Sequence, residues 1–580
     1  MRFTRLLSAT SLNLPSQSFW RGLAIAVAFI GALGVAYSAN TNGRIKGVVT
    51  DPQSSVVSGA QITATNMATG VKYDSVSGSD GGYLFAELPV GTYSISASAA
   101  GFKGFTATGI VLSIDQEYVE AVHLTIGSAT ELVEVQASAV QVNTTDMQLN
   151  NVVNSEQIVE LPLINRTFTG LELTLPGVQA SSDRFSSNYS VSGGQTQQSE
   201  YLINGADTND IALNTLVLAP NLDAIDEFNL IDGPLNAEYD RNSGGIVSAT
   251  IKQGTNHFHG DAFEFYRDTF LNTLSFFQKN VTTGEGVVSP YHQNIFGGTV
   301  GGPIFKDKLF FFGAYQGTRQ TVPQAGGSAS VFDTANLNGN FSVEDNGPAN
   351  APPTAANPTW GSFSANPIPA TINITGCTTA GETWAQCAYA LNGVFNPANF
   401  NKIATSLDSK YLPAPNNGTY GYTFNPITAT TANQYIGRID YALNPANQIT
   451  ALYLLHKQTV ADTLPFTGAS LPGFGDQDVE TITQYTGDYV HQFNSTTVND
   501  FAGHYTRFNY QAVIPQNVVS PTSLGFNINP QDAAAASVPT ISVSGNDSGF
   551  TLGFSTNGPQ PRIDQVAQLD DNLSKVVGRL

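Results

Sequence analysis

The sequence predicts a mainly β protein made of three successive parts: a small β-sandwich, a small mixed α/β domain, and antiparallel strands of a membrane β-barrel. Glycine (55), phenylalanine (34) and tyrosine (22) are abundant and charged residues make up 12%, a balance that suits tight turns and aromatic girdles. Short stretches of alternating polarity, bounded by Gly, Pro or Asp, recur along the chain and indicate strands. After the polar turn 254–257 the sequence changes to aromatic-rich alternating stretches separated by long polar loops, which places a domain junction there.

The N-terminus has the pattern of a signal peptide. An apolar run at 22–36 follows three arginines, and Ala36 and Ser38 supply the small residues of a cleavage site. A transmembrane helix needs about 20 apolar residues, and this run is shorter. We therefore expect residues 1–38 to be removed by cleavage between Ser38 and Ala39, and the mature protein to be exported without a membrane helix.

Charge and motifs narrow the classes of function. The formal net charge of −21 disfavours nucleic acid as a partner, because phosphates need a basic surface. The chain has no Gly-x-Ser-x-Gly, His-Glu-x-x-His or Cys-x-x-Cys motif, so we predict no catalytic residue, no metal ligand, no cofactor and no enzyme activity. Cys377 and Cys387 share one Ala/Asn/Pro/Thr-rich region. In an oxidising compartment their spacing favours a local disulfide, the alternative being two unpaired thiols.

Residues 43–126 predict the β-sandwich, because short period-two strands alternate with glycine, proline and aspartate turns. The turn passages 79–82 and 88–91 resemble those of carboxypeptidase regulatory-like, transthyretin-type domains, a group with carbohydrate-binding-like folds. The resemblance implies a periplasmic spacer or docking module. Sugar binding is the alternative, although no exposed aromatic platform is evident. The expected core consists of Val48, Ile62, Ala64, Tyr83, Phe85, Tyr93 and Ile95.

A linker at 127–139 follows the sandwich and contains an extended, partly β-branched segment. Such a segment suits either the last strand of the sandwich or a strand that adds to the sheet edge of a partner protein. The residues concerned are Glu131, Leu132, Val133, Glu134, Val135, Gln136 and Ala137.

Residues 140–254 predict the small α/β domain. Ser155 is the expected cap of a helical turn that ends before a proline, and 246–251 alternates as a strand. The hydrophobic residues between 225 and 231 are available for a small core. They are Ile225, Phe228, Leu230 and Ile231.

Residues 255–580 predict barrel strands, because one face of such a strand meets lipid and the other the lumen. The stretch 318–433 has little periodicity, and we expect it to be a long extracellular loop. Further strands are expected at 549–556 and from about Leu573. The main predicted strands are 260–268, 292–300, 308–317, 434–442, 447–456, 482–492 and 496–509.

A family resemblance is carried by the passage 237–260, Ala-Glu-Tyr-Asp-Arg-Asn-Ser-Gly-Gly-Ile-Val-Ser-Ala-Thr-Ile-Lys-Gln-Gly-Thr-Asn-His-Phe-His-Gly. Together with Asn165-Arg166 and the passage 171–177, it resembles the plug of a TonB-dependent receptor, where the plug runs directly into the barrel. Asn204-Gly205 stands where many members have Asp-Gly, a mild departure. The sandwich before the plug resembles the Oar-like branch of that family.

The resemblance implies an outer-membrane receptor whose plug blocks the barrel, with the sandwich and plug on the periplasmic side. Residues 131–137 resemble the box that such receptors offer to the inner-membrane TonB protein. Outer-membrane lipid, a TonB-type coupling protein and an extracellular ligand are the implied partners. The ligand would be a bulky oligosaccharide or other glycan, a peptide or a metal chelate. The alternative is an Oar-like adhesion or structural surface protein without active transport.

Receptors of this type have about 22 strands, and the chain after residue 254 has room for far fewer. An open sheet would leave unpaired backbone groups in lipid, which is energetically forbidden. We therefore expect the chain to contain the first part of the barrel, C-terminally truncated.

Overall fold

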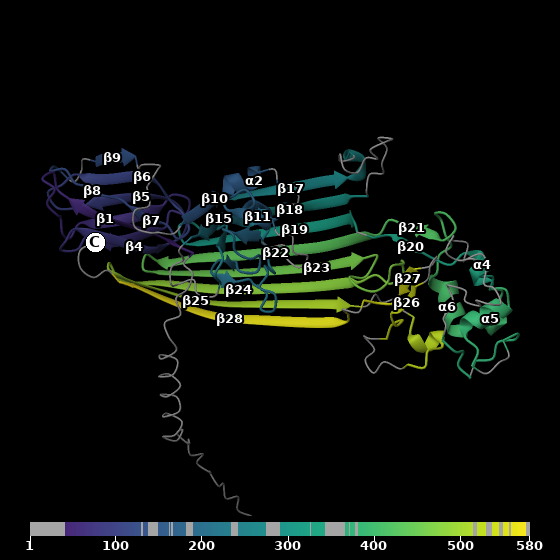
Figure 1. The fold of residues 1–580 in the computed structure, drawn as a ribbon. Coiled ribbons are helices and arrows are strands. Elements are labelled where there is room, and N and C mark those ends of the chain that lie inside the picture. The colour runs from purple at the N-terminus through teal and green to yellow at the C-terminus, as the bar shows by residue number, and fades with distance from the viewer. Residues whose placement is uncertain are drawn as a thin grey trace, which may run out of the picture.

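The computed structural model describes residues 41–128, 132–136, 149–161, 163, 166–180, 189–233, 242–273, 290–324, 326–342, 366–370, 372–377, 381–513, 519–528, 536–544, 549–555 and 558–575. The β-sandwich lies at one end of a long sheet of barrel strands, the α/β domain (the plug) lies against the sheet, and a smaller mixed unit lies at the other end (Figure 1). The structure is mainly β, as the sequence predicts. None of the described helices is long and apolar enough to cross a membrane.

The sandwich consists of two sheets that enclose one hydrophobic core. Six of its predicted core residues are buried, whereas Val48 is half-buried. The correction has a simple cause: β1 alternates with the opposite parity, so Ile45 and Val49 face the core. The strands are β1 Gly43–Thr50, β2 Gln61–Asn66, β3 Lys72–Val76, β4 Gly82–Leu88, β5 Gly91–Ser98, β6 Gly104–Leu112, β7 Glu117–Val119, β8 Val122–His123 and β9 Leu132–Gln136.

The plug contains a five-stranded mixed sheet of order β10-β15-β16-β13-β14. Its four predicted core residues between Ile225 and Ile231 are at most 1% exposed, so that prediction is confirmed. The N-cap residue of helix α2 is Asn154 rather than Ser155, and Asn154 and Gln157 form a reciprocal capping box. The elements are β10 Leu149–Asn154, α2 Ser155–Glu160, α3 Phe168–Glu172, β11 Val178–Ala180, β12 Tyr189–Val191, β13 Glu200–Ile203, β14 Ala206–Asp207, η1 Leu222–Ala224, β15 Ile225–Asp232 and β16 Ile246–Ile251.

The barrel wall is an eight-stranded antiparallel sheet in which each strand pairs with the next along the wall. All seven main predicted strands are present, and five of them extend further at the end away from the sandwich. The predicted strand starting near Leu573 is wrong, because that residue lies near the end of β28. The strands are β17 His259–Asp268, β18 His292–Phe305, β19 Leu309–Pro323, β22 Ile427–Asn444, β23 Asn447–Asp462, β24 Gln477–Asn494, β25 Thr497–Val513 and β28 Gln560–Lys575.

The outer face of this wall carries aromatic rings in a cross-strand row. The ring centroids of Tyr315 and Tyr435 lie 5.1 Å apart, those of Tyr453 and Tyr485 5.1 Å, and those of Tyr485 and Tyr505 6.4 Å. Residues of the opposite parity face the plug and are mostly buried. Amphipathic rings at one level of an outward face are typical of a membrane–water interface.

The unit at the far end, which we call the cap, corrects the prediction of a structure-poor loop at 318–433. Strands β19 and β22 take both ends of that stretch. Its described residues 329–332 and 403–422 share a hydrophobic core with residues of 469–474, 519–526, 538–543 and 550–554. The predicted strand at 549–556 forms β27 of the cap and does not join the wall. The cap elements are β20 Ser328–Ser330, α4 Thr334–Leu337, α5 Trp384–Ala390, η4 Pro397–Asn399, α6 Lys402–Tyr411, β21 Gly421–Thr423, η5 Pro521–Leu524, β26 Ile541–Ser544 and β27 Gly549–Leu552.

Candidate functional site: the plug, its seat and the outer cavity

Three inward-facing glutamines of the wall bind the backbone of the plug. The Gln434 amide donates to the carbonyl of Ala219 at 2.7 Å and accepts from the backbone N–H of Asn221 at 2.7 Å. Gln484 donates to the carbonyl of Ile203 at 3.0 Å. Gln568 donates to Gly205 and accepts from Asp207, both at 3.2 Å. An amide side chain can donate and accept at once, and Gln434 and Gln568 do both with the plug backbone, whereas Gln484 donates to it.

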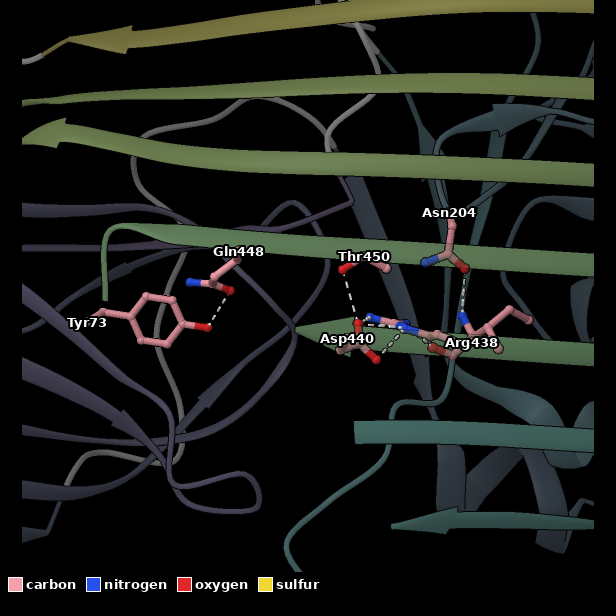
Figure 2. A network of polar contacts seen from close by, with 7 residues as sticks. Tyr73, Asn204, Arg438, Asp440, Gln448 and Thr450 are labelled. Atoms are coloured by element: carbon pink, nitrogen blue, oxygen red, sulfur yellow. Dashed lines mark hydrogen bonds and ion pairs between the residues drawn. The ribbon is translucent and has the colours of Figure 1, made fainter. Parts of the chain in front are cut away.

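A buried arginine on β22 holds the end of the plug, where the chain leaves it for the barrel. The Arg438 guanidinium donates to the carbonyl of Ile251 and pairs with Asp440 at 2.9 Å. Thr450 donates to the same carboxylate at 3.0 Å, and the side-chain Oδ1 of Asn204 accepts from the backbone N–H of Ile251 at 2.9 Å (Figure 2). The network fixes both polar groups of the last residue of β16.

Two further ion pairs join or brace the plug. Arg166 and Asp223 pair at 2.8 Å with side chains 7% and 4% exposed, and the guanidinium lies 4.0 Å from the ring centroid of Phe265 on β17. Asp210, at the apex of the plug, pairs with Arg562 of β28 at 2.5 Å. Buried pairs of this kind are costly to break, because the remaining charge has no partner. The Arg166–Asp223 pair lies within the plug, and the plug is joined to the wall by the Asp210–Arg562 pair and by the contact of Arg166 with Phe265.

A cavity of about 720 Å³ lies between the plug apex, the outer ends of the wall strands and the cap. Plug residues 210–217 form one side of it. Its opposite side carries carboxylates and aromatic rings, a mixture that suits a polar ligand with apolar faces. Among the described residues no group of His, Cys, Asp or Glu is arranged to hold a metal ion. The residues of that side are Asp462, Phe466, Asp476, Asp478, Glu480, Phe508, Tyr510 and Arg562.

One acidic side chain is enclosed within the plug itself. Glu172 of α3 is fully buried, and the Tyr201 hydroxyl lies 3.4 Å from it. Burial raises the pKa of Glu172 to about 8, because the charged form loses its hydration. The carboxyl is therefore largely protonated at neutral pH and adds no charge to the plug core.

The residues singled out in the sequence fall into three groups: those in a strand, those in a disulfide, and those outside the described ranges. Leu132–Gln136 form β9, the edge strand of a sandwich sheet, paired in parallel with β6; this is the arrangement that the sandwich-strand alternative predicts. Cys377 and Cys387 form a disulfide with Cα atoms 5.2 Å apart. The remaining predicted residues, Glu131, Ala137, Ser38 and Ala39, lie outside the described ranges.

The wall residues that bind the plug, Gln434, Arg438, Gln484 and Gln568, were not predicted from the sequence. The first three come from strands that were correctly located, and they share the inward parity of those strands. A polar side chain at an inward position, such as Gln434, Arg438 or Gln484, is the signal that was available in the sequence.

Comparison with known proteins identifies the class. Residues 250–579 match the family model of the outer membrane beta barrel domain, and residues 44–125 match that of the carboxypeptidase regulatory-like domain. The chain therefore belongs to the outer membrane β-barrel family, with a carboxypeptidase regulatory-like domain before the plug. An outer-membrane location follows.

Individual relatives refine this assignment. The chain is 28% identical over 288 residues to the TonB-dependent transporter Oar of Myxococcus xanthus, a match that covers 47% of this chain and 26% of that protein. The predicted resemblance to Oar-like TonB-dependent receptors is thereby confirmed.

Two solved structures are also similar. The outer membrane transporter YddB from Escherichia coli matches with a TM-score of 0.43 and 11% identity over 74% of this chain and 46% of its own. A mutant of the ferric enterobactin receptor PfeA from Pseudomonas aeruginosa matches with a TM-score of 0.36 and 11% identity over 73% of this chain and 46% of its own.

Proposed function

We propose that this protein is a receptor for energy-coupled uptake of a bulky ligand across the outer membrane. The observation that carries the proposal is the position of the plug apex. Residues 210–217 line the outer cavity, and Asp210 pairs there with Arg562 of the wall. A ligand in the cavity therefore touches the plug and the wall together. It shifts the position of the plug if it binds better when the pair is rearranged.

The proposed ligand is an oligosaccharide, a peptide or a metal chelate. The cavity volume of about 720 Å³ lies within the usual range for small-ligand sites. Its carboxylates and rings suit hydrogen-bonding and stacking with such molecules. The proposed coupling partner is a TonB-type protein that pairs with the segment 131–137 by strand addition. The edge position of β9 supports this proposal, because among the described strands only β6 pairs with it in its sheet.

The test is accumulation of labelled oligosaccharides, peptides and ferric chelates by cells with and without the protein. One of these ligand classes should accumulate only when the protein is present, and a protonophore should abolish that accumulation. An Asp210→Asn variant should weaken uptake of the same ligand, because the apex loses its charge. Accumulation that needs neither the protein nor proton motive force would contradict the proposal.

A second candidate function is adhesion at the cell surface, and the cap favours it. The cap has its own core and a disulfide between Cys377 and Cys387, so it presents a rigid surface outside the membrane. Loss of cell-surface contacts in cells without the protein, with no change in uptake of any tested ligand, would favour adhesion over transport.

A further inference from the structure

The sandwich does not stand apart from the barrel as a spacer would. Phe310, on the inward face of β19, packs into the hydrophobic core cluster of the sandwich. The Tyr73 hydroxyl donates to Gln448 on the inward face of β23 at 3.1 Å (Figure 2). The Asn42 amide lies 3.5 Å from the carboxylate of Asp500 on β25. The sandwich therefore enters the mouth of the wall at the end with short turns, which in outer-membrane barrels faces the periplasm.

The sandwich also contacts the plug directly. Glu227 of β15 is 8% exposed, and its two carboxylate oxygens accept from the Ser113 hydroxyl at 3.1 Å and from the Ile114 N–H at 2.9 Å. The sandwich thus holds a plug residue that has no charged partner of opposite sign in these contacts.

A third contact fixes the sandwich where the plug joins the barrel. The Asn256 amide donates to the carbonyl of Thr69 at 2.6 Å, and its backbone N–H donates to the carbonyl of Ala68 at 2.9 Å. The same side chain accepts from the N–H of Asp307, in the β18–β19 turn, at 2.9 Å. One sandwich turn is therefore bound to both the plug exit and the rim of the wall.

Little space remains between the three parts. The cavity where they meet has a volume of about 60 Å³, which is room for a few water molecules. It is lined by Asn42 and Glu87 of the sandwich, Asn204 and Asp226 of the plug, and Arg438 and Asp500 of the wall. At this point the sandwich, the plug and the wall therefore lie against one another.

We propose that the sandwich is a lock that closes the periplasmic mouth beneath the plug and must undock before the plug can open. Its role in uptake rests on the function proposed above, whereas the lock itself is a property of the fold. Because β9 belongs to the sandwich, a pull on the coupling segment acts on the lock before it reaches the plug. The order of events is then undocking of the sandwich, followed by movement of the plug.

A disulfide across the contact tests the lock. A Cβ built on Gly70 would lie 3.3 Å from Cγ of Asp307. That Cγ stands where the Sγ of a cysteine at position 307 would lie, so the two cysteine side chains are within reach of a disulfide. Cys377 and Cys387 are already paired with each other, so Gly70→Cys with Asp307→Cys forms a separate pair. Both positions have positive φ, and the strain of a cysteine there is the same in the oxidised and reduced protein.

The readout is amide hydrogen exchange of β15 and β16 in the purified full chain. If plug opening requires undocking, exchange should be at least about tenfold slower in the oxidised double variant than in the reduced one. The two single-cysteine variants, treated with the same oxidant and reductant, should show no such difference; this controls for reduction of the native disulfide.

The converse variant weakens the contact. Asn256→Ala removes the side-chain bond to Thr69, which crosses to the sandwich, together with the bonds to Asp307 at the rim of the wall. Loss of the crossing bond should speed plug exchange by up to about tenfold, the size expected for one lost hydrogen bond. The matched control is Asn444→Ala, whose bonds stay within its own turn. If neither a complete cross-link nor Asn256→Ala changes the amide exchange rates of β15 and β16, the lock hypothesis is refuted. The sandwich would then be a spacer.

The exchange experiment needs no ligand and no energy source, so it separates the two proposals. A lock without energy-dependent uptake would refute the transport function alone. Full energy-dependent uptake by cells that carry the oxidised cross-link would refute the lock alone.

Discussion

Glu227 gives a sharp prediction for the pH dependence of stability. Burial raises the pKa of this carboxyl from 4.5 to about 7, with the neighbouring Asp226 charge adding to the effect and the hydrogen bonds from Ile114 and Ser113 opposing it. Each pKa unit corresponds to about 1.4 kcal/mol, so the difference amounts to about 3 kcal/mol. The folded protein holds the proton more tightly than the unfolded chain. The contribution of Glu227 to the free energy of unfolding is therefore fully present below about pH 4.5. It decreases as the pH rises to about 7 and is lost above that pH.

The perturbation is Glu227→Gln, which imitates the protonated carboxyl. Its carbonyl can accept from Ile114 while its amide donates to the Ser113 hydroxyl, so the contact with the sandwich is preserved. We expect the variant to match wild type at pH 4.5 and to be more stable by up to about 3 kcal/mol at pH 8. The assay is denaturant unfolding of both proteins in detergent at the two pH values.

The comparison of the two proteins removes the contribution of all other titrating groups. Ser113→Ala, which deletes the hydrogen bond that the Ser113 hydroxyl donates to Glu227 and keeps the carboxyl, is the matched control and should retain the pH dependence. A stability difference between wild type and Glu227→Gln that is the same at both pH values would refute the reasoning.

Four further predictions follow from burial, charge and chain topology. Residues 41–128 expressed alone should melt cooperatively, and Phe85→Ala should cost about 3–5 kcal/mol because its buried ring leaves a cavity; a non-cooperative melt would contradict the domain boundary. Asp223→Ala should cost about 3–5 kcal/mol by leaving Arg166 buried without a partner, and a double-mutant cycle with Arg166→Met should recover most of it. Cys377→Ser should destabilise the cap by about 3 kcal/mol, seen as faster proteolysis there with unchanged plug exchange. Val133→Pro should abolish energy-dependent uptake and leave ligand binding intact, because proline cannot donate within an added strand; unchanged uptake would favour a purely structural β9.

Local patterns in the sequence determined the parts of the protein that depend on near neighbours in the chain. Alternation with period two located seven strands of the wall, since it reports a side chain's face directly. The four core residues between Ile225 and Ile231 were predicted from their hydrophobic character, and all four are buried. The short spacing of Cys377 and Cys387 made their disulfide predictable, because a bridge across so few residues needs no long-range information.

Only the tertiary structure decided the features that join distant segments. Val48 faces away from the core and Val49 faces it, because strand pairing sets the parity and a shift of one residue exchanges the two faces. The cap gathers pieces separated by more than a hundred residues, none of which has a strong pattern of its own. Gln434 meets Asn221, and Asn256 meets Thr69, through contacts between whole domains. Such contacts depend on how finished domains fit together, which no stretch of the chain encodes by itself.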